Sequence, residues 1–290
     1  MLRLPLRRVA ALAGFGLVGI ALPARAQRPA PLDPEKIRVC ADPDNMPSSN
    51  DKLEGYENKL ATLISQELKA KLEYVWYPTR RGYFRILNGM YCDLAMEVPA
   101  GLDMAGATKP YFRSGYVFVT RKGGGLDDIN SLADPRLKKL KIGVNIYTSD
   151  AENSPPAMAL SHYGVVGNLT GYSTFFDENN RPDDIIKAVA NQDVDLAIAW
   201  GPLAGYYAKQ SKVPLVLTPL PAKDSLSEFP FQYNIGIAVR RKDKEFKDSL
   251  EAVLTRRQPE VQAILKEYAV PLMPIEQAHG DEKGEAKASS

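Results

Sequence analysis

Cysteine and histidine are scarce, with two residues of each type among 290. No CxxC or CxxCH pattern is present, which excludes a thioredoxin-like redox site and covalently attached haem. The histidines, His162 and His279, lie far apart in the sequence and have no cysteine nearby, which argues against a metal centre. They also cannot complete a Ser-His-Asp or Cys-His arrangement. We therefore expect no metal and no cofactor.

Long apolar runs are also lacking, apart from one near the amino terminus. Arg3, Arg7 and Arg8 precede an uncharged apolar stretch over residues 9–22, and Ala24-Arg25-Ala26 follows as an A-x-A cleavage pattern. This order predicts a signal peptide over residues 1–26, cleaved near Ala26/Gln27, and export to the periplasm. The stretch is shorter than the roughly 20 residues that span a bilayer, so we expect no transmembrane anchor in the mature chain.

A concentrated basic surface is absent from the expected mature chain. The full sequence carries a formal charge of +2, but residues 1–26 contain four arginines and no acidic residue, so their removal leaves −2. Nucleic-acid binding requires a basic surface that faces the phosphates, so we expect no nucleic-acid partner. In an exported protein, an even cysteine count favours a disulfide, here between Cys40 and Cys92.

Strands and helices are expected to alternate along the chain. Apolar periodicity and β-branched residues predict strands near residues 38–41, 72–77, 93–96, 141–144, 194–199 and 233–240. Helical spacing predicts helices at residues 60–68, 81–88 and 182–191, and two more after residue 240. Helix-length crossovers between strands predict an α/β fold with parallel-type sheets that helices cover on both faces.

The two halves of the chain repeat one another. NGMYCDLAMEVPAG from Asn88 and NQDVDLAIAWGPLAG from Asn191 share a helix end, a D-L-A strand and a proline-containing turn. A glycine run at residues 123–125 separates the halves. We expect two similarly wound lobes, followed by a disordered tail over residues 276–290, which has no apolar periodicity.

Several strings resemble solute-binding proteins. The GYEN string from Gly55, the D-L-A strands, Lys109-Pro110-Tyr111 and the G-I-A-V-R strand from Gly236 are similar to family 3 extracellular solute-binding proteins, which have the type II periplasmic binding fold. The resemblance implies a first lobe of residues 34–117 plus 236–275, a second lobe of residues 118–235, and a two-strand hinge. In that fold Cys40 and Cys92 lie on neighbouring strands.

Longer strings narrow the resemblance to one subgroup. RVCADPDNMPSSN from Arg38, YPTRRGYFR from Tyr77 and AWGPLAGYYA from Ala199 are similar to the MoxJ/XoxJ subgroup. This resemblance implies an accessory factor that matures or activates a PQQ-dependent methanol dehydrogenase, in one version a lanthanide-dependent enzyme. The implied partners are the dehydrogenase and its cytochrome c.

The family's anchors for an amino-acid ligand are missing from this sequence. Residues 99–105 offer no arginine for a carboxylate, and Trp200 stands where the family places an acid for the ammonium group. We instead expect a cleft at strand ends and helix starts, where open α/β sheets bind ligands or partners. The expected cleft residues are Asp42, Asp44, Asn45, Tyr56, Arg80, Arg81, Pro99, Tyr147, Thr148, Ser149 and Trp200.

Two other functions are weighed against the accessory role. A solute receptor of an ABC transporter for a small molecule other than an amino acid would share the same fold, and the sequence leaves open whether a small ligand binds. An enzyme would need a poised acid or base in the cleft, and Glu97 is the one candidate. A glutamate at a strand end is usually structural, so we expect no catalytic residue and no enzymatic activity.

Overall fold

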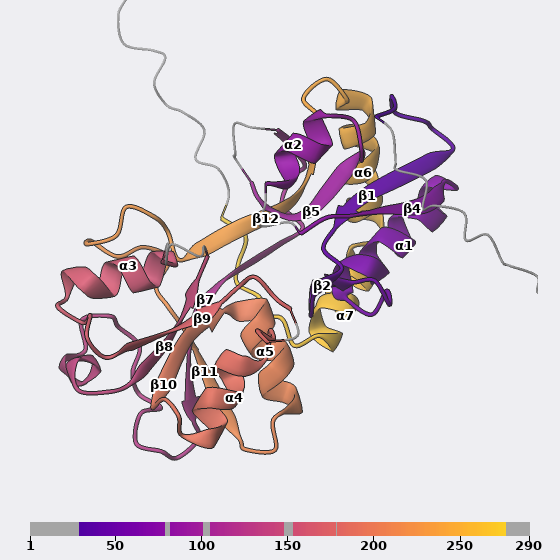
Figure 1. Cartoon of the computed structure of the whole chain (residues 1–290). Helices are drawn as coiled ribbons and strands as arrows, with labels where there is room; N and C mark the ends of the chain where they lie inside the picture. Colours follow the sequence, from indigo (N-terminus) through magenta and orange to yellow (C-terminus); the bar gives the residue numbers. More distant parts are fainter. Residues whose placement is uncertain (1–28, 79–81, 101–104, 148–152, 178, 277–290) are drawn as a thin grey trace, which may run out of the picture.

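The computed structural model describes residues 29–78, 82–100, 105–147, 153–177 and 179–276. Figure 1 shows two bodies joined by long strands, which we call the first and second lobes. In the first lobe the elements are β1 (Lys36–Ala41), β2 (Asp44–Asn45), β3 (Ser49–Asn50), α1 (Tyr56–Leu68), β4 (Lys71–Trp76), α2 (Tyr83–Asn88), β5 (Leu94–Pro99), β6 (Gly106–Ala107), α6 (Lys244–Arg256) and α7 (Gln258–Glu267).

The second lobe contains a similar alternation of strands and helices. Its elements are the 3-10 helix η2 (Pro135–Lys138), β8 (Ile142–Ile146), α3 (Pro155–His162), β9 (Leu169–Ser173), α4 (Asp184–Asn191), β10 (Leu196–Trp200), α5 (Gly201–Gln210) and β11 (Leu215–Pro219). Two longer strands, β7 (Phe112–Arg121) and β12 (Gln232–Val239), pass between the lobes.

The sheet is mixed, which refines the expectation of a parallel-type sheet in each lobe. Its strand order is β4-β1-β5-β12-β7-β10-β8-β9, with β11 beside β7 and β6 beside β12. The pairs of β1 with β4 and β5, and of β8 with β9 and β10, are parallel. All pairs that involve β7 or β12 are antiparallel, because these strands cross between the lobes in opposite directions.

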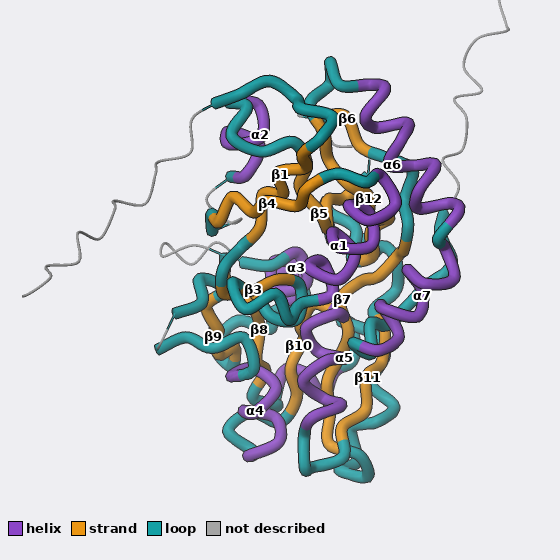
Figure 2. The backbone as a smooth tube through the Cα atoms, turned by 90° about the vertical axis from the view of Figure 1, so that its right-hand side faces the viewer, coloured by secondary structure: helices purple, strands orange, loops and turns teal. Residues whose placement is uncertain are grey.

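Helices cover both faces of the sheet in each lobe. In the first lobe, Val39 and Met96 face a core that includes α1, α6 and α7, whereas their neighbours Cys40 and Ala95 face α2. This alternation is the period of two expected for a strand that is buried on both faces. Figure 2 shows α6 and α7 along one side of the first lobe, with α4 towards the far end of the second lobe and α5 nearer to α7.

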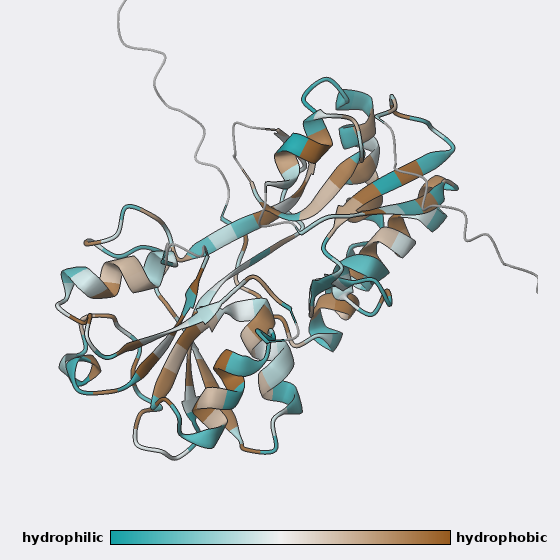
Figure 3. Cartoon of the chain, in the orientation of Figure 1, coloured by the Kyte–Doolittle hydropathy of each residue, from teal (hydrophilic) through white to brown (hydrophobic). Residues whose placement is uncertain are grey.

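The second lobe has its own two cores. Phe118 and Ile198 pack towards α3 and η2, while Val119 and Ala197 pack towards α4 and α5. Figure 3 shows the resulting pattern, with apolar strands inside and hydrophilic residues on loops and outer helix faces. The two-lobed arrangement follows from these separate cores, and the lobe boundaries given above stay a prediction.

The carboxyl-terminal segment crosses the strands that link the lobes. The hydroxyl of Ser114 in β7 donates to the carbonyl oxygen of Pro271 at 2.8 Å, and the amide of Met273 donates to the carbonyl of Arg113 at 2.9 Å. Glu276 forms an ion pair with Arg113 at 2.6 Å and accepts a hydrogen bond from Asn234 in β12 through its carbonyl oxygen at 2.7 Å. This segment therefore joins both crossing strands.

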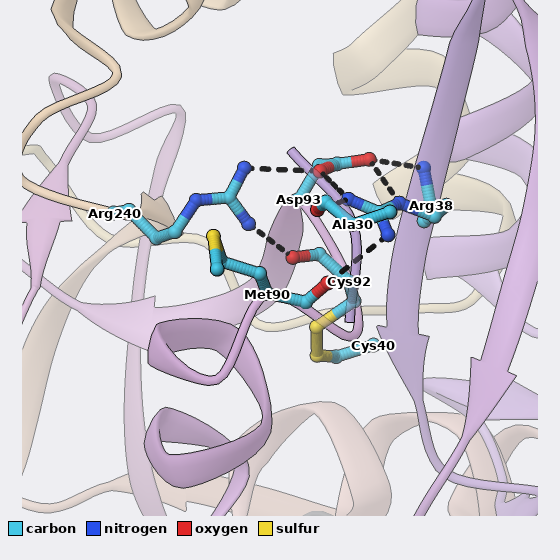
Figure 4. Close-up of a disulfide and its surroundings, with 7 residues drawn as sticks. All are labelled: Ala30, Arg38, Cys40, Met90, Cys92, Asp93 and Arg240. Carbon is cyan, nitrogen blue, oxygen red and sulfur yellow. Dashed lines mark hydrogen bonds and ion pairs between the residues drawn. A yellow bond between two sulfur atoms is a disulfide. The ribbon is translucent and has the colours of Figure 1, made fainter. Parts of the chain in front are cut away.

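A disulfide and a buried ion-pair network connect the strands of the first lobe (Figure 4). Cys40 and Cys92 form the predicted disulfide. The adjacent Asp93 carboxylate is fully buried and accepts from the Arg38 Nε at 2.9 Å and from the Arg240 guanidinium at 3.0 Å. Both arginines come from neighbouring strands, so one carboxylate links the ends of β1, β5 and β12.

Candidate functional site

A cavity of about 400 Å³ lies between the two lobes. This volume is within the roughly 300–1,000 Å³ typical of small-molecule sites. The cavity is lined by Asn45, Met46, Pro47, Ser48, Glu57, Tyr83, Met96, Glu97, Pro99, Tyr116, Asn145, Tyr147, Pro155, Thr174, Trp200, Leu203, Tyr233 and Ile235. Residues from both lobes and from both crossing strands therefore meet at one site.

Glu97 is held at the centre of this site by donors from both lobes. Its Oε1 accepts from the Trp200 Nε1 at 2.6 Å, and its Oε2 accepts from the Ser48 hydroxyl at 2.5 Å. Glu97 has a φ of 53°, a left-handed conformation that is unusual for a residue other than glycine. The register between β5 and β12 shifts between Gly236 and Ala238, opposite this residue. The irregularity re-aims the Glu97 side chain towards the second lobe, as bulges near functional sites do.

Ser48 reaches Glu97 because the chain packs closely against the start of α1. The Glu57 amide donates to the Ser48 carbonyl at 2.9 Å. A Cβ on Gly55 would lie 2.1 Å from that same carbonyl oxygen, so only glycine allows this approach. The Ser48 hydroxyl then lies between Glu97 and the Tyr56 hydroxyl, 3.1 Å away.

Glu57 is a second carboxyl group in the lining, and it is buried to 6% exposure. Burial raises the pKa of Glu57 well above its ordinary value, and the nearby carboxylates of Glu97 and Asp42 raise it further. A hydrogen bond with Ser49 acts in the opposite direction but does not outweigh burial. Burial therefore favours the protonated form of Glu57 in the folded protein.

Aromatic rings form walls around the two carboxyl groups. The ring of Trp200 lies 5.5 Å from that of Tyr116 at an interplanar angle of 69°, and 6.0 Å from that of Tyr233 at 61°. The Tyr116 hydroxyl is hydrogen bonded to that of Tyr147. Burial raises the pKa of Tyr233 to about 12, so its hydroxyl stays protonated. These rings pack edge to face against one another and together form one wall of the cavity.

Four of the expected cleft residues line this cavity, namely Asn45, Pro99, Tyr147 and Trp200. Three others lie outside the lining. Asp42 is buried beside β1, Asp44 is exposed, and Tyr56 is fully buried in the first-lobe core. Arg80, Arg81, Thr148 and Ser149 lie outside the described residues, as do the expected signal peptide and the tail after Glu276.

Several lining residues were not among the expected cleft residues. Glu57 belongs to the GYEN string, but the resemblance gave it no role at the site. Tyr233 was expected solely as the first residue of a strand over residues 233–240, and Tyr116 was given no role at the site. A buried strand tyrosine looks the same in sequence whether or not it borders a cavity. Glu97 was considered solely as a candidate acid or base. The lobe-to-lobe bond from Trp200 to Glu97 joins residues 103 positions apart, and no local pattern encodes it.

Metal-binding and membrane features can be assessed for the described part of the chain. There, no group of three or more His, Cys, Asp and Glu side chains is arranged to hold a metal ion. Across the same residues, no helix combines the length and the apolarity needed to cross a bilayer.

Comparisons of sequence agree with the architecture. Residues 93–269 match the family described as bacterial extracellular solute-binding protein. The chain is 30% identical over 270 residues to protein MoxJ of Methylorubrum extorquens, covering 87% of this chain and 86% of the relative. It is 29% identical over 276 residues to protein MoxJ of Paracoccus denitrificans, covering 90% and 96% of the two chains.

Solved structures that resemble this chain also include binding proteins. The periplasmic binding protein XoxJ from Methylobacterium extorquens AM1 is 37% identical with a TM-score of 0.67, covering 82% of this chain and all 100% of that one. MxaJ from Methlophaga aminisulfidivorans MPT is 28% identical with a TM-score of 0.70 and the same coverage. An ancestral cationic amino acid solute-binding protein, 20% identical with a TM-score of 0.62, shares the fold.

Proposed function

The chain belongs to the bacterial extracellular solute-binding proteins, and from this membership we propose that it is a periplasmic accessory factor of a PQQ-dependent methanol dehydrogenase. It binds the dehydrogenase and acts in its maturation or activation. The similarity to MoxJ and XoxJ over most of the chain is the observation that carries the proposal. The family is one of binding proteins and not a class of enzymes.

The composition of the cleft supports a role other than amino-acid uptake. The described lining contains no arginine or lysine that could pair with a carboxylate. At the position of the family's ammonium-binding acid, Trp200 instead donates to Glu97 at 2.6 Å. An amino acid would leave its carboxylate unpaired in this part of the cleft, at a cost of several kcal/mol by order of magnitude.

The alternative function is that of a solute receptor for an ABC transporter whose ligand is not an amino acid. The cavity of about 400 Å³ favours the receptor function, because a protein that binds only other proteins does not need a cavity of ligand size. The two functions differ in what must bind tightly. A receptor requires a small ligand, whereas an accessory factor requires a large complementary surface on the dehydrogenase or its cytochrome c.

The test is to titrate the mature chain, residues 27–290, into the methanol dehydrogenase from the same organism and to follow binding by calorimetry. Activation of the apo-dehydrogenase is measured in parallel, with an amino-acid receptor of the same fold as the control protein. We expect binding together with a higher yield of active enzyme for this chain alone. No binding at tens of micromolar would leave the solute receptor as the better function.

A further inference from the structure

The cavity between the lobes has a one-sided distribution of charge. Glu57 and Glu97 are the ionisable carboxyl groups of the described lining, and this part of the lining contains no arginine, lysine or histidine. Both groups are carboxyl groups, and Glu97 is the one that Trp200 and Ser48 contact from the two lobes. A ligand that contacts this region is favoured when it is positively charged.

Three aromatic rings line the cavity at Trp200, the residue whose indole donates to Glu97. Trp200, Tyr116 and Tyr233 meet at interplanar angles of 69° and 61°, which presents ring faces and edges from several directions. The face of an aromatic ring attracts a cation, and sets of such rings recognise quaternary ammonium groups. The rings come from β7, from the end of β10 and from β12, so the sheet fixes their positions.

The Glu97 carboxylate is oriented before any ligand arrives. The Trp200 Nε1 and the Ser48 hydroxyl each donate to one of its oxygens, at 2.6 and 2.5 Å. Both oxygens can still accept further contacts, because an ionised carboxylate has about four lone-pair sites. A fixed anion beside a Trp ring offers a cation two favourable contacts without loss of side-chain entropy on binding.

The size and polarity of the site select among cations. A volume of about 400 Å³ exceeds what a bare metal ion or ammonium ion would fill. A primary ammonium group could use the oxygen acceptors of the lining, but rings and apolar side chains such as Met46, Pro47 and Ile235 form most of the wall surface, which favours an alkylated cation. A nitrogen covered by alkyl groups needs no hydrogen-bond acceptor and spreads its charge over a larger apolar surface.

We propose that this cavity is a binding site for a small quaternary ammonium ion, held by the Trp200, Tyr116 and Tyr233 rings and by the Glu97 carboxylate. The site is independent of the proposed contact with a dehydrogenase, and it supplies a ligand class for the cleft that the accessory function does not require. The site is built from both lobes, since Glu97 comes from the first lobe and Trp200 from the second.

The test compares choline with 3,3-dimethylbutan-1-ol, its uncharged carbon isostere, by isothermal titration of the mature chain alone. We expect choline to bind at least about tenfold more tightly than the alcohol, because the two share a shape and differ in charge. Equal affinity for both compounds, or no binding of either at millimolar concentration, would overturn the proposal. The dehydrogenase is absent from this titration, so the result is separate from the test of the accessory function.

Two sets of variants locate the ligand. Tyr233→Leu removes one ring and should weaken choline binding about tenfold, while the conservative Tyr233→Phe, which keeps the ring, restores most of the affinity. Glu97→Gln removes the charge at constant size and should lower the affinity for choline but not for the alcohol. Thermal unfolding of each variant verifies the fold. Choline binding that is unchanged in both Tyr233→Leu and Glu97→Gln would place the ligand elsewhere and contradict the proposal.

Discussion

Glu57 is a side chain in the cavity lining whose burial lowers the stability of the folded protein. Its carboxyl group is 6% exposed, next to Glu97 and Asp42, and burial raises its pKa. A buried acid with like charges nearby opposes its own ionisation, and folding then favours the protonated form. Such residues concentrate at binding and catalytic sites, where the fold tolerates a local cost.

We predict that Glu57→Gln stabilises the protein at neutral pH. The folded chain keeps a proton on Glu57 that the unfolded chain releases above a pKa of about 4.3. The free energy of unfolding of the wild type therefore falls as pH rises from that value through the raised folded pKa. Gln cannot ionise, so its Tm should exceed that of the wild type by several degrees at pH 7, and the two should converge near pH 4. Thermal unfolding between pH 4 and 8 measures this, and a variant less stable than the wild type at pH 7 would contradict it.

At the scale of elements, the strands and helices with strong local patterns were predicted well. The expected strand at residues 38–41 is part of β1, and the expected helix at residues 182–191 contains α4. The helix α5 and the strands β9 and β11 were not predicted. α5 carries Gly201, Pro202 and Gly205 within ten residues, which weakens a helical pattern, and none of the five residues of β9 is fully buried. Their structure depends on packing against β7 and β8, which local sequence does not report.

We predict that Asp93→Asn strongly destabilises the first lobe. The change leaves the guanidinium groups of Arg38 and Arg240 buried without their shared carboxylate, which costs about 3–5 kcal/mol for a buried pair. The matched control is Asp128→Asn, because the Asp128 pair with Arg136 is exposed and should leave the free energy of unfolding nearly unchanged. Urea unfolding compares the two variants. An equal decrease in the free energy of unfolding for both would show that the buried Asp93 network stabilises the protein no more than an exposed ion pair does.

The disulfide should increase the free energy of unfolding of the first lobe by a similar amount. Cys40 and Cys92 are separated by 52 residues, and closing a loop of that length stabilises the folded state by about 4 kcal/mol through the unfolded chain. Cys40→Ala combined with Cys92→Ala should remove this contribution, with reduced wild-type protein as the comparison. A loss below about 1 kcal/mol would mean that the unfolded chain is already restricted in this region.

At the scale of the whole molecule, the sequence predicted two lobes and the disulfide, but not how closely the lobes touch. The internal repeat and the family resemblance indicated a two-lobed fold. Neither could indicate that the Trp200 indole reaches Glu97 or that the segment after α7 crosses β7 and β12. Such contacts join residues that are distant in sequence, and they depend on the relative placement of complete lobes.

One lobe-to-lobe contact predicts a mutational effect. A Cβ on Gly205 of α5 would lie 2.0 Å from the carbonyl oxygen of Ala269, just after α7. Gly205→Ala should therefore push α5 away from this segment and lower the free energy of unfolding by about 1–3 kcal/mol, as overpacking does. Gly167→Ala is the control, since nothing lies within 4 Å of its Cβ, and it should change stability by less than about 0.5 kcal/mol. Indistinguishable urea midpoints for the two variants would refute the contact.

The position of β12 also sets an order of assembly during synthesis. β5 pairs on one side with β1 and on the other with β12, which is synthesised well over a hundred residues later. A chain that emerges from its amino terminus can close the Cys40–Cys92 link early, but its first sheet keeps an open edge at β5 until residues 232–239 have been synthesised. The second lobe is contiguous from β7 to β11 and can form before this edge is paired. During that interval the unpaired edge exposes the nascent chain to aggregation, and a chaperone that covers it would protect the chain.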